Sequence, residues 1–97
     1  VSIGQDGPSQ TALEDIAMMN AVANSVIVYP ADAVSAYYLT QEIARYDHGM
    51  SYLRITRNEL PVVYDAQAVF HIGGSTILKQ HKGCDVVCIA AAGITVH

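Results

Sequence analysis

The first 30 residues read as a helix followed by a strand. Apolar residues recur every three or four positions behind Thr11 and Glu14, which form a capping-box pattern, so a helix is predicted over about 11–22. The β-branched run 25–29 is stopped by Pro30 and predicts a short buried parallel strand. The polypeptide thus begins with a helix-then-strand unit.

A second helix and strand follow with short connections. Asp32 has the character of an N-cap for a helix over about 33–46, whose apolar residues cover much of its circumference and predict packing on two sides. The alternating segment 51–57 predicts another strand. Helix, strand, helix and strand in this order indicate an α/β fold, part of a doubly wound parallel sheet.

The pattern changes after residue 60. Residues 61–83 mix short apolar pieces with glycines and polar residues, which predicts a linker with one or two short strands. The apolar run 86–91 predicts a buried strand that opens a second α/β domain over 84–97. Cys84 and Cys88 would lie roughly 13 Å apart in a strand, beyond the ~7 Å that a disulfide spans, so we expect two reduced, packed thiols.

Composition adds two constraints. Of the 97 residues, 52% are apolar and 14% charged, although a domain of this size buries only about two-thirds of its unfolded surface. We therefore expect further polypeptide or a second chain to cover the excess, and the start at Val1 rather than Met also suggests a piece of a longer protein. A net charge of −4 with five Lys and Arg residues argues against a nucleic-acid partner.

The distribution of apolar residues also bears on the cellular location of the protein. No apolar run approaches the ~20 residues of a membrane helix, and nothing resembles a secretory leader. We expect a cytoplasmic protein with no membrane partner.

Three residues are candidates for binding chemistry. Asp6 and Gln10 lie in the glycine-bounded loop 4–15 ahead of the first helix. Asp6 could bind a polyhydroxyl ligand or serve as a turn aspartate, and Gln10 could contact a heterocycle or face solvent. Arg57, at the expected carboxyl end of a strand, could grip a phosphate or be a surface arginine. The four histidines lack ligand spacing, so we assign no metal site.

Three motifs in this order resemble transketolase, and more narrowly its animal-type branch. They are the loop 4–15, the segment Val28-Tyr29-Pro30-Ala31-Asp32, and the segment Leu53-Arg54-Ile55-Thr56-Arg57. The resemblance covers nearly the whole chain.

The domain boundaries follow from this resemblance. It makes residues 1–60 the second half of the pyrimidine-binding domain, 61–83 the interdomain linker and 84–97 the start of the carboxy-terminal domain.

The resemblance implies transfer of a two-carbon ketol unit from a ketose phosphate to an aldose phosphate through thiamine diphosphate, in the pentose phosphate pathway. By similarity Asp6 binds a sugar hydroxyl, Arg57 the sugar phosphate, and Gln10 lies against the cofactor. Many transketolases carry histidine where Gln10 stands, so a proton relay there is in doubt.

Other parts of the family's site have no counterpart in this sequence. The magnesium and diphosphate ligands, and the glutamate that activates the cofactor, are expected outside it. The implied partners are a sugar phosphate, the remaining polypeptide and a second copy in a homodimer. The chain alone is expected to be inactive.

Two alternatives stay open. Another thiamine diphosphate enzyme, such as 1-deoxyxylulose 5-phosphate synthase or the pyruvate dehydrogenase beta subunit, would share the fold, although Thr56-Arg57-Asn58 looks closer to transketolase. A non-catalytic dimerisation module is the second alternative.

Overall fold

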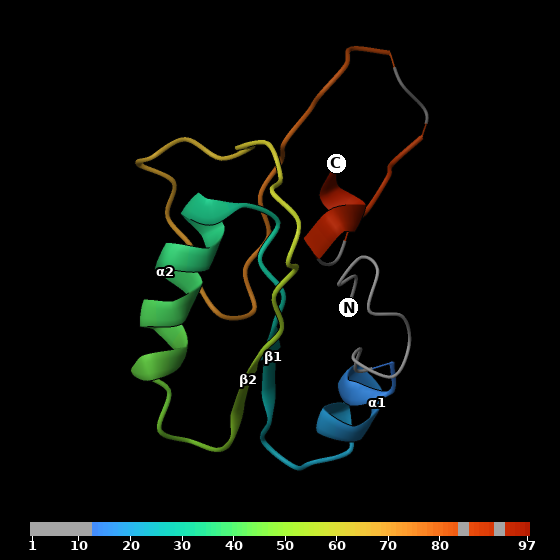
Figure 1. The fold of residues 1–97 in the computed structure, drawn as a ribbon. Coiled ribbons are helices and arrows are strands. Elements are labelled where there is room, and N and C mark those ends of the chain that lie inside the picture. The colour runs from blue at the N-terminus through green and yellow to red at the C-terminus, as the bar shows by residue number, and fades with distance from the viewer. Residues whose placement is uncertain (1–12, 84–85, 91–92) are drawn as a thin grey trace.

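The protein forms a small α/β unit around two parallel strands (Figure 1). The computed structural model describes residues 13–83, 86–90 and 93–97. Its elements, in chain order, are α1 (Asp15–Asn20), β1 (Val26–Val28), α2 (Ala33–Ala44), β2 (Ser51–Leu53) and the 3₁₀ helix η3 (Gly93–Val96).

The two strands pair in parallel, with Val26 opposite Ser51 and Val28 opposite Leu53. α1 contacts β1 and α2 contacts β2, and Figure 1 shows the two helices on opposite sides of the strand pair. The predicted α/β class with parallel strands is confirmed.

α1 is shorter than the helix predicted over 11–22. Glu14 is its N-cap residue and makes no side-chain capping hydrogen bond, while Thr11 lies outside the described residues. At the other end the chain tightens into a turn in which the Ala21 N–H donates to the Met18 carbonyl at 3.2 Å. The Ser25 hydroxyl donates to the Met19 carbonyl at 2.6 Å, so the carbonyls of the last turn find partners without further helix.

The loops that precede the two strands are held against each other. Asn24 adopts a left-handed conformation with φ of 56°, which asparagine tolerates better than most residues. The Tyr46 hydroxyl donates to the Asn24 carbonyl at 2.9 Å, and a Cβ on Gly49 would overlap that carbonyl oxygen. Gly49 is therefore required by a close backbone approach at the amino ends of the strands.

β2 ends earlier than the strand predicted over 51–57. Its ladder closes where the Arg54 N–H donates to the Val28 carbonyl at 2.9 Å. The next donor in register would be residue 30, which is a proline and has no N–H. The chain beyond Arg54 therefore leaves the sheet, and Arg57 lies in a bend rather than at a strand tip.

The segment after residue 60 contains none of the predicted strands in its described part. Residues 61–83 and 86–90 belong to no strand, and the expected buried strand over 86–91 is replaced by an exposed stretch followed by η3. Val87 is 84% exposed and Ile89 is 88% exposed. An extended segment needs a neighbouring strand for its backbone groups, and residues 86–90 pair with none.

The cysteine prediction is corrected by the same segment. Cys88 is free, as expected, but exposed rather than packed, because the strand that would have buried it does not form. Cys84 lies outside the described residues.

Asp32 is the residue that joins α2 to the segment after β2. Its Oδ1 accepts hydrogen bonds from the Ser35 N–H at 2.8 Å and the Ser35 hydroxyl at 2.7 Å, which confirms the predicted N-cap. Its Oδ2 accepts from the N–H groups of Val63 at 2.8 Å and Tyr64 at 3.0 Å. Burial raises the pKa of Asp32, but these donors outweigh it and hold the pKa below its usual value.

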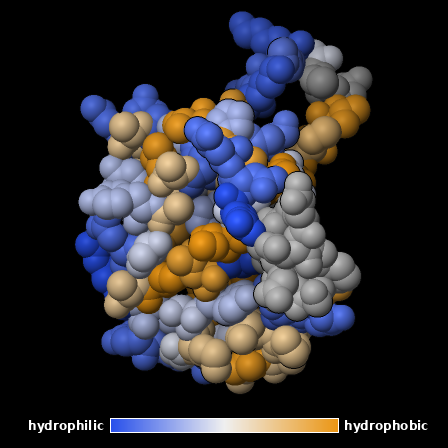
Figure 2. Space-filling model, in the orientation of Figure 1, coloured by the Kyte–Doolittle hydropathy of each residue, from blue (hydrophilic) through white to orange (hydrophobic). Residues whose placement is uncertain are grey.

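The described residues enclose only a small hydrophobic core. Val28 and Ala31 are the buried apolar residues among them, whereas large side chains such as Leu13, Val69 and Ile77 are mostly exposed. In Figure 2 hydrophobic surface lies on the body of the molecule and on the outlying loop. The further polypeptide or second chain that the composition predicts over this apolar surface stays a prediction. No helix in the described ranges has the length and hydrophobicity needed to cross a bilayer.

Replacing Asp32 with alanine should lower the free energy of unfolding by about 2 to 4 kcal/mol, because it removes a helix cap and leaves two backbone N–H groups of the 63–64 segment without an acceptor. Urea unfolding measures the loss. Asp47→Ala is the control, since the Asp47 side chain is 84% exposed and its loss should stay within about 0.5 kcal/mol. Equal losses would contradict the assigned role of Asp32.

Stability should also fall in acid through Asp32. Because its folded pKa lies below the usual 3.8, the stabilisation by the carboxylate is present above that value and is lost as pH falls through the lowered pKa. The difference in unfolding free energy between the wild type and Asp32→Asn should therefore shrink between about pH 5 and pH 2. A difference that is constant over this range would show that the carboxylate charge is not involved.

Candidate functional site

A cleft opens at the carboxyl ends of β1 and β2, where α/β sheets bind ligands. Its volume is about 310 Å³, and the segment after β1 and the segment after β2 form its two sides. The lining includes Pro30, Asp32, Ala36, Ile55, Thr56 and Asn58. The cleft forms because the segments that follow β1 and β2 leave the pair of strands at the same level and then diverge. The first leads into α2 and the second into the bend at residue 57.

Of the three predicted site residues, Arg57 is the one that lies within the described residues. Arg57 is exposed and lies between Thr56 and Asn58, both of which line the cleft. Asp6 and Gln10 lie outside the described residues, so their approach to Arg57 stays a prediction. Arg57 itself is not a lining residue. It lies in a bend between two lining residues and not on the strand that was expected to present it, so its role at the cleft stays a prediction.

The acidic groups of the cleft differ in availability. Both oxygens of Asp32 are engaged by backbone and hydroxyl donors, and the side chain belongs to the floor of the cleft. Glu59 lines the cleft as an exposed residue. The nearby Tyr64 has a pKa raised by burial and by the Asp32 charge, so it stays a neutral phenol near pH 7. Asp32 therefore acts as a structural acceptor rather than a base.

A buried polar network runs beneath the cleft from α1 to β2. Asp15 is 3% exposed; its Oδ2 accepts a hydrogen bond from the Tyr52 hydroxyl at 2.8 Å and lies 3.5 Å from the Arg54 Nε. Burial raises the pKa of Asp15, but the bond from Tyr52, the Ile16 N–H and the Arg54 charge together lower it. The network fixes a carboxylate and a guanidinium under the carboxyl end of the sheet.

Tyr29 connects this network to the cleft. The Arg54 guanidinium lies over the Tyr29 ring, 5.0 Å from its centroid, a distance at which a cation is attracted to the ring face. The Tyr29 hydroxyl lies 2.9 Å from the Thr56 Oγ1. The side chain that follows β1 thus contacts the segment that follows β2.

The last described segment docks at the end of β1. The Gly93 N–H donates to the Tyr29 carbonyl at 2.9 Å, and the His97 Nε2 lies 2.8 Å from the Ala31 carbonyl oxygen. Gly93 has φ of 48°, and a Cβ on it would overlap the Tyr29 ring. A residue with a side chain could not take this position without moving the ring.

Sequence reasoning missed this network. A charged residue between the apolar Leu53 and Ile55 was a signal for Arg54, because a charge inside a strand requires a partner when buried. The partner itself, Asp15, is 39 positions away and could not be identified without the fold. Tyr29 carried no signal beyond its place at the end of an apolar run.

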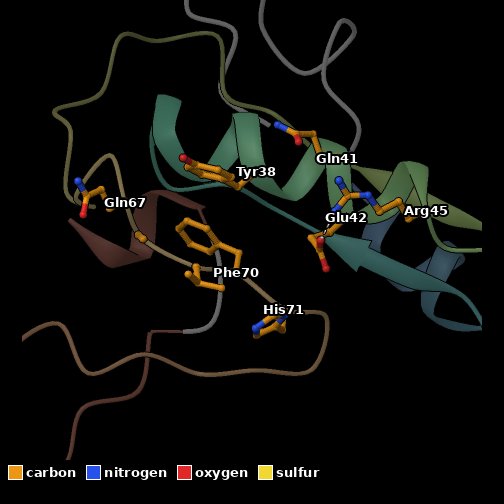
Figure 3. Close-up of a pocket in the computed structure, with 9 residues that line it drawn as sticks. Tyr38, Gln41, Glu42, Arg45, Gln67, Phe70 and His71 are labelled. Carbon is orange, nitrogen blue, oxygen red and sulfur yellow. Dashed lines mark hydrogen bonds and ion pairs between the residues drawn. The ribbon is translucent and has the colours of Figure 1, made fainter.

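A second hollow of about 340 Å³ lies between α2 and the segment 67–71 (Figure 3). Tyr38 stacks on Phe70 with ring centroids 6.0 Å apart, and Arg45 pairs with Glu42 at 3.2 Å on its rim. The Tyr37 ring meets the Tyr38 ring edge-on, with centroids 5.2 Å apart. None of the predicted site residues is among those that line this hollow.

Within the described ranges, no three His, Cys, Asp or Glu side chains gather in a way that could hold a metal ion. The cleft is lined by apolar residues together with hydroxyl, amide and carboxylate groups, and the exposed Arg57 lies between two of its lining residues in the sequence.

Comparison with known proteins identifies relatives in sequence. The family model described as "Transketolase, pyrimidine binding domain" matches residues 1–63. The chain is 44% identical over 100 residues to "Transketolase-like protein 1" of Bos taurus and 41% identical over 97 residues to "Transketolase-like protein 2" of Mus musculus. It is 38% identical over 97 residues to "Transketolase" of Homo sapiens.

These matches cover all of this chain but a small part of each relative. The share covered is 16% of the Bos taurus protein and 15% of the other two, so the chain spans about one-sixth of the length of the curated relatives it matches. No solved structure matches the chain.

Replacing Gly93 with alanine should loosen the docking of η3 on Tyr29. Gly83→Ala is a matched control, because Gly83 also has a positive φ, of 78°, but no atom stands near its missing Cβ. Backbone strain alone should cost about 1 kcal/mol in both variants, and displacement of the ring about 1 to 3 kcal/mol more at Gly93. Hydrogen exchange over residues 93–97 and urea unfolding measure the difference, and identical behaviour would rule out the close packing.

Proposed function

The chain belongs to the transketolase family, and on that premise we propose that it forms part of an enzyme that transfers a two-carbon ketol unit from a ketose phosphate to an aldose phosphate. The cleft at the carboxyl ends of β1 and β2 supports this proposal, because Arg57 directly follows one of its lining residues and precedes another in the sequence. Parallel sheets bind ligands at this end.

Arg57 is the proposed phosphate-binding residue. A guanidinium presents several N–H donors in a planar fork and binds phosphate in bidentate fashion. Of the two acids in the lining, Asp32 already has its oxygens occupied by four donors, which reduces its repulsion of an anion. Its charge therefore opposes phosphate binding less than its position suggests.

Asp6 and Gln10 take their proposed roles from the family resemblance. Asp6 would accept a hydrogen bond from a sugar hydroxyl, and Gln10 would hydrogen-bond the cofactor as donor or acceptor. A carboxamide does not titrate near neutral pH, so Gln10 would orient groups without moving a proton.

Thiamine diphosphate and magnesium are the proposed cofactors. Bound thiamine diphosphate supplies the electron sink for breaking a carbon–carbon bond beside a carbonyl. The described residues offer no metal-binding cluster, so we assign the magnesium ligands to none of them. The contribution proposed for this chain is to orient the sugar phosphate and neutralise its charge.

The setting proposed for the chain is a longer transketolase polypeptide that acts as a cytoplasmic homodimer in the pentose phosphate pathway. In that setting the separate chain would be inactive. A non-catalytic association module is the second candidate, and the exposed apolar side chains favour it, since extended apolar surface marks sites of protein contact. Measurable ketol transfer by the complete protein would decide between them.

In the complete enzyme, Arg57→Ala should lower kcat/KM for phosphorylated sugars by about 10- to 100-fold, because a charge-assisted pair with the phosphate is lost. For unphosphorylated ketoses the loss should stay below about threefold. Steady-state kinetics with both substrate classes make the comparison. Arg45→Ala is the control, since Arg45 is a 73% exposed arginine on α2, and equal losses for both substrates in Arg57→Ala would remove the proposed role.

A further inference from the structure

Tyr29 contacts three parts of the chain that are distant in sequence. Its ring lies against Arg54 and Gly93, its hydroxyl reaches Thr56, and its carbonyl accepts the Gly93 N–H. We propose that Tyr29 is a positioning residue that holds the segment Thr56-Arg57 at the substrate cleft and ties it to the docked segment 93–97. This inference rests on the proposed function for its kinetic consequence, but its structural part does not.

The segment that follows β2 needs a contact outside the strand ladder to fix its position. The parallel ladder ends with the bond from Arg54 to Val28, and the described residues 55–58 belong to no strand. Regular backbone pairing therefore does not set the position of this segment. A side-chain bond from a neighbouring, well-held residue is a direct way to fix it.

The Tyr29 side chain is itself held firmly by its neighbours. It directly follows the buried Val28 and precedes the buried Pro30. Its ring is confined between the Arg54 guanidinium at 5.0 Å and the backbone of Gly93, which leaves no room for a Cβ. Arg54 is anchored in turn by the buried Asp15. The hydroxyl is therefore presented from a side chain with little freedom to change rotamer.

The bond from the Tyr29 hydroxyl ends at the residue next to the proposed phosphate-binding Arg57. The Tyr29 hydroxyl lies 2.9 Å from Thr56 Oγ1, and Thr56 both lines the cleft and directly precedes Arg57. A displacement of about 1 Å is enough to weaken the contacts that a binding group makes with its ligand. Loss of the Tyr29 hydroxyl would reach the substrate through the placement of Arg57.

Tyr29→Phe in the complete enzyme tests this inference, because it removes the hydroxyl and keeps the ring. We expect KM for a phosphorylated sugar to rise by about three- to tenfold, the worth of one hydrogen bond, while kcat and the kinetics of an unphosphorylated ketose change less than about twofold. Tyr46→Phe is the matched control, since its hydroxyl also makes one 2.9 Å bond but at the opposite end of the sheet.

A double-mutant cycle with Thr56→Val isolates the bond between the two hydroxyls. If the bond positions Arg57, the double variant should lose no more than Tyr29→Phe alone, because either change already breaks it. Additive losses in the double variant would overturn the inference, as would equal KM changes for phosphorylated and unphosphorylated substrates.

Hydrogen exchange provides a readout that does not depend on activity. Tyr29→Phe should raise the exchange rates of backbone amides over 54–58 more than Tyr46→Phe does, and Tyr29→Ala should also raise those over 93–97. Unchanged exchange in both variants would overturn the tether even if ketol transfer is confirmed. Absence of ketol transfer by the wild type would defeat the proposed function while exchange still decides the role of Tyr29.

Discussion

One carboxylate organises the carboxyl end of the sheet. Asp32 caps α2 through Ser35 with one oxygen and holds the backbone of Val63 and Tyr64 with the other. The start of the helix and the path of the chain after β2 are therefore fixed to each other at the same point. The cleft lies beside this junction, because Asp32 lines it and the two residues bonded to its Oδ2 follow the second side of the cleft along the chain.

The sequence predicted those features that depend on neighbours along the chain. The cap at Asp32, the strand predicted over 25–29 and the helix that follows are local patterns. All three are present, the strand as Val26–Val28. β2 was overestimated because alternation continues to Arg57, whereas pairing requires a partner and stops opposite Pro30. The second pair of bonds at Asp32 could not be predicted, since the residues that supply them are about 30 positions away.

The candidate site also has some features that the sequence predicts and others that only the fold shows. The place of Arg57 at the end of the sheet followed from strand order and from the family resemblance. The residues that hold this region, Asp15, Arg54 and Tyr29, came only from the fold, because each is explained by a contact with a distant residue. Burial accounts for the corrections as well: Cys88 is exposed because no strand lies beside it, and burial of a cysteine depends on its surroundings more than on its type.

The segments at the two ends of the sheet are held together in different ways. At the amino ends, Gly49 and Asn24 approach so closely that a Cβ on Gly49 would overlap the Asn24 backbone. At the carboxyl ends, side chains such as Asp32 and Tyr29 also bond to the segments that follow β2. A side chain introduced at Gly49 would therefore have to displace backbone, whereas a substitution at Asp32 or Thr56 acts by removing side-chain hydrogen bonds.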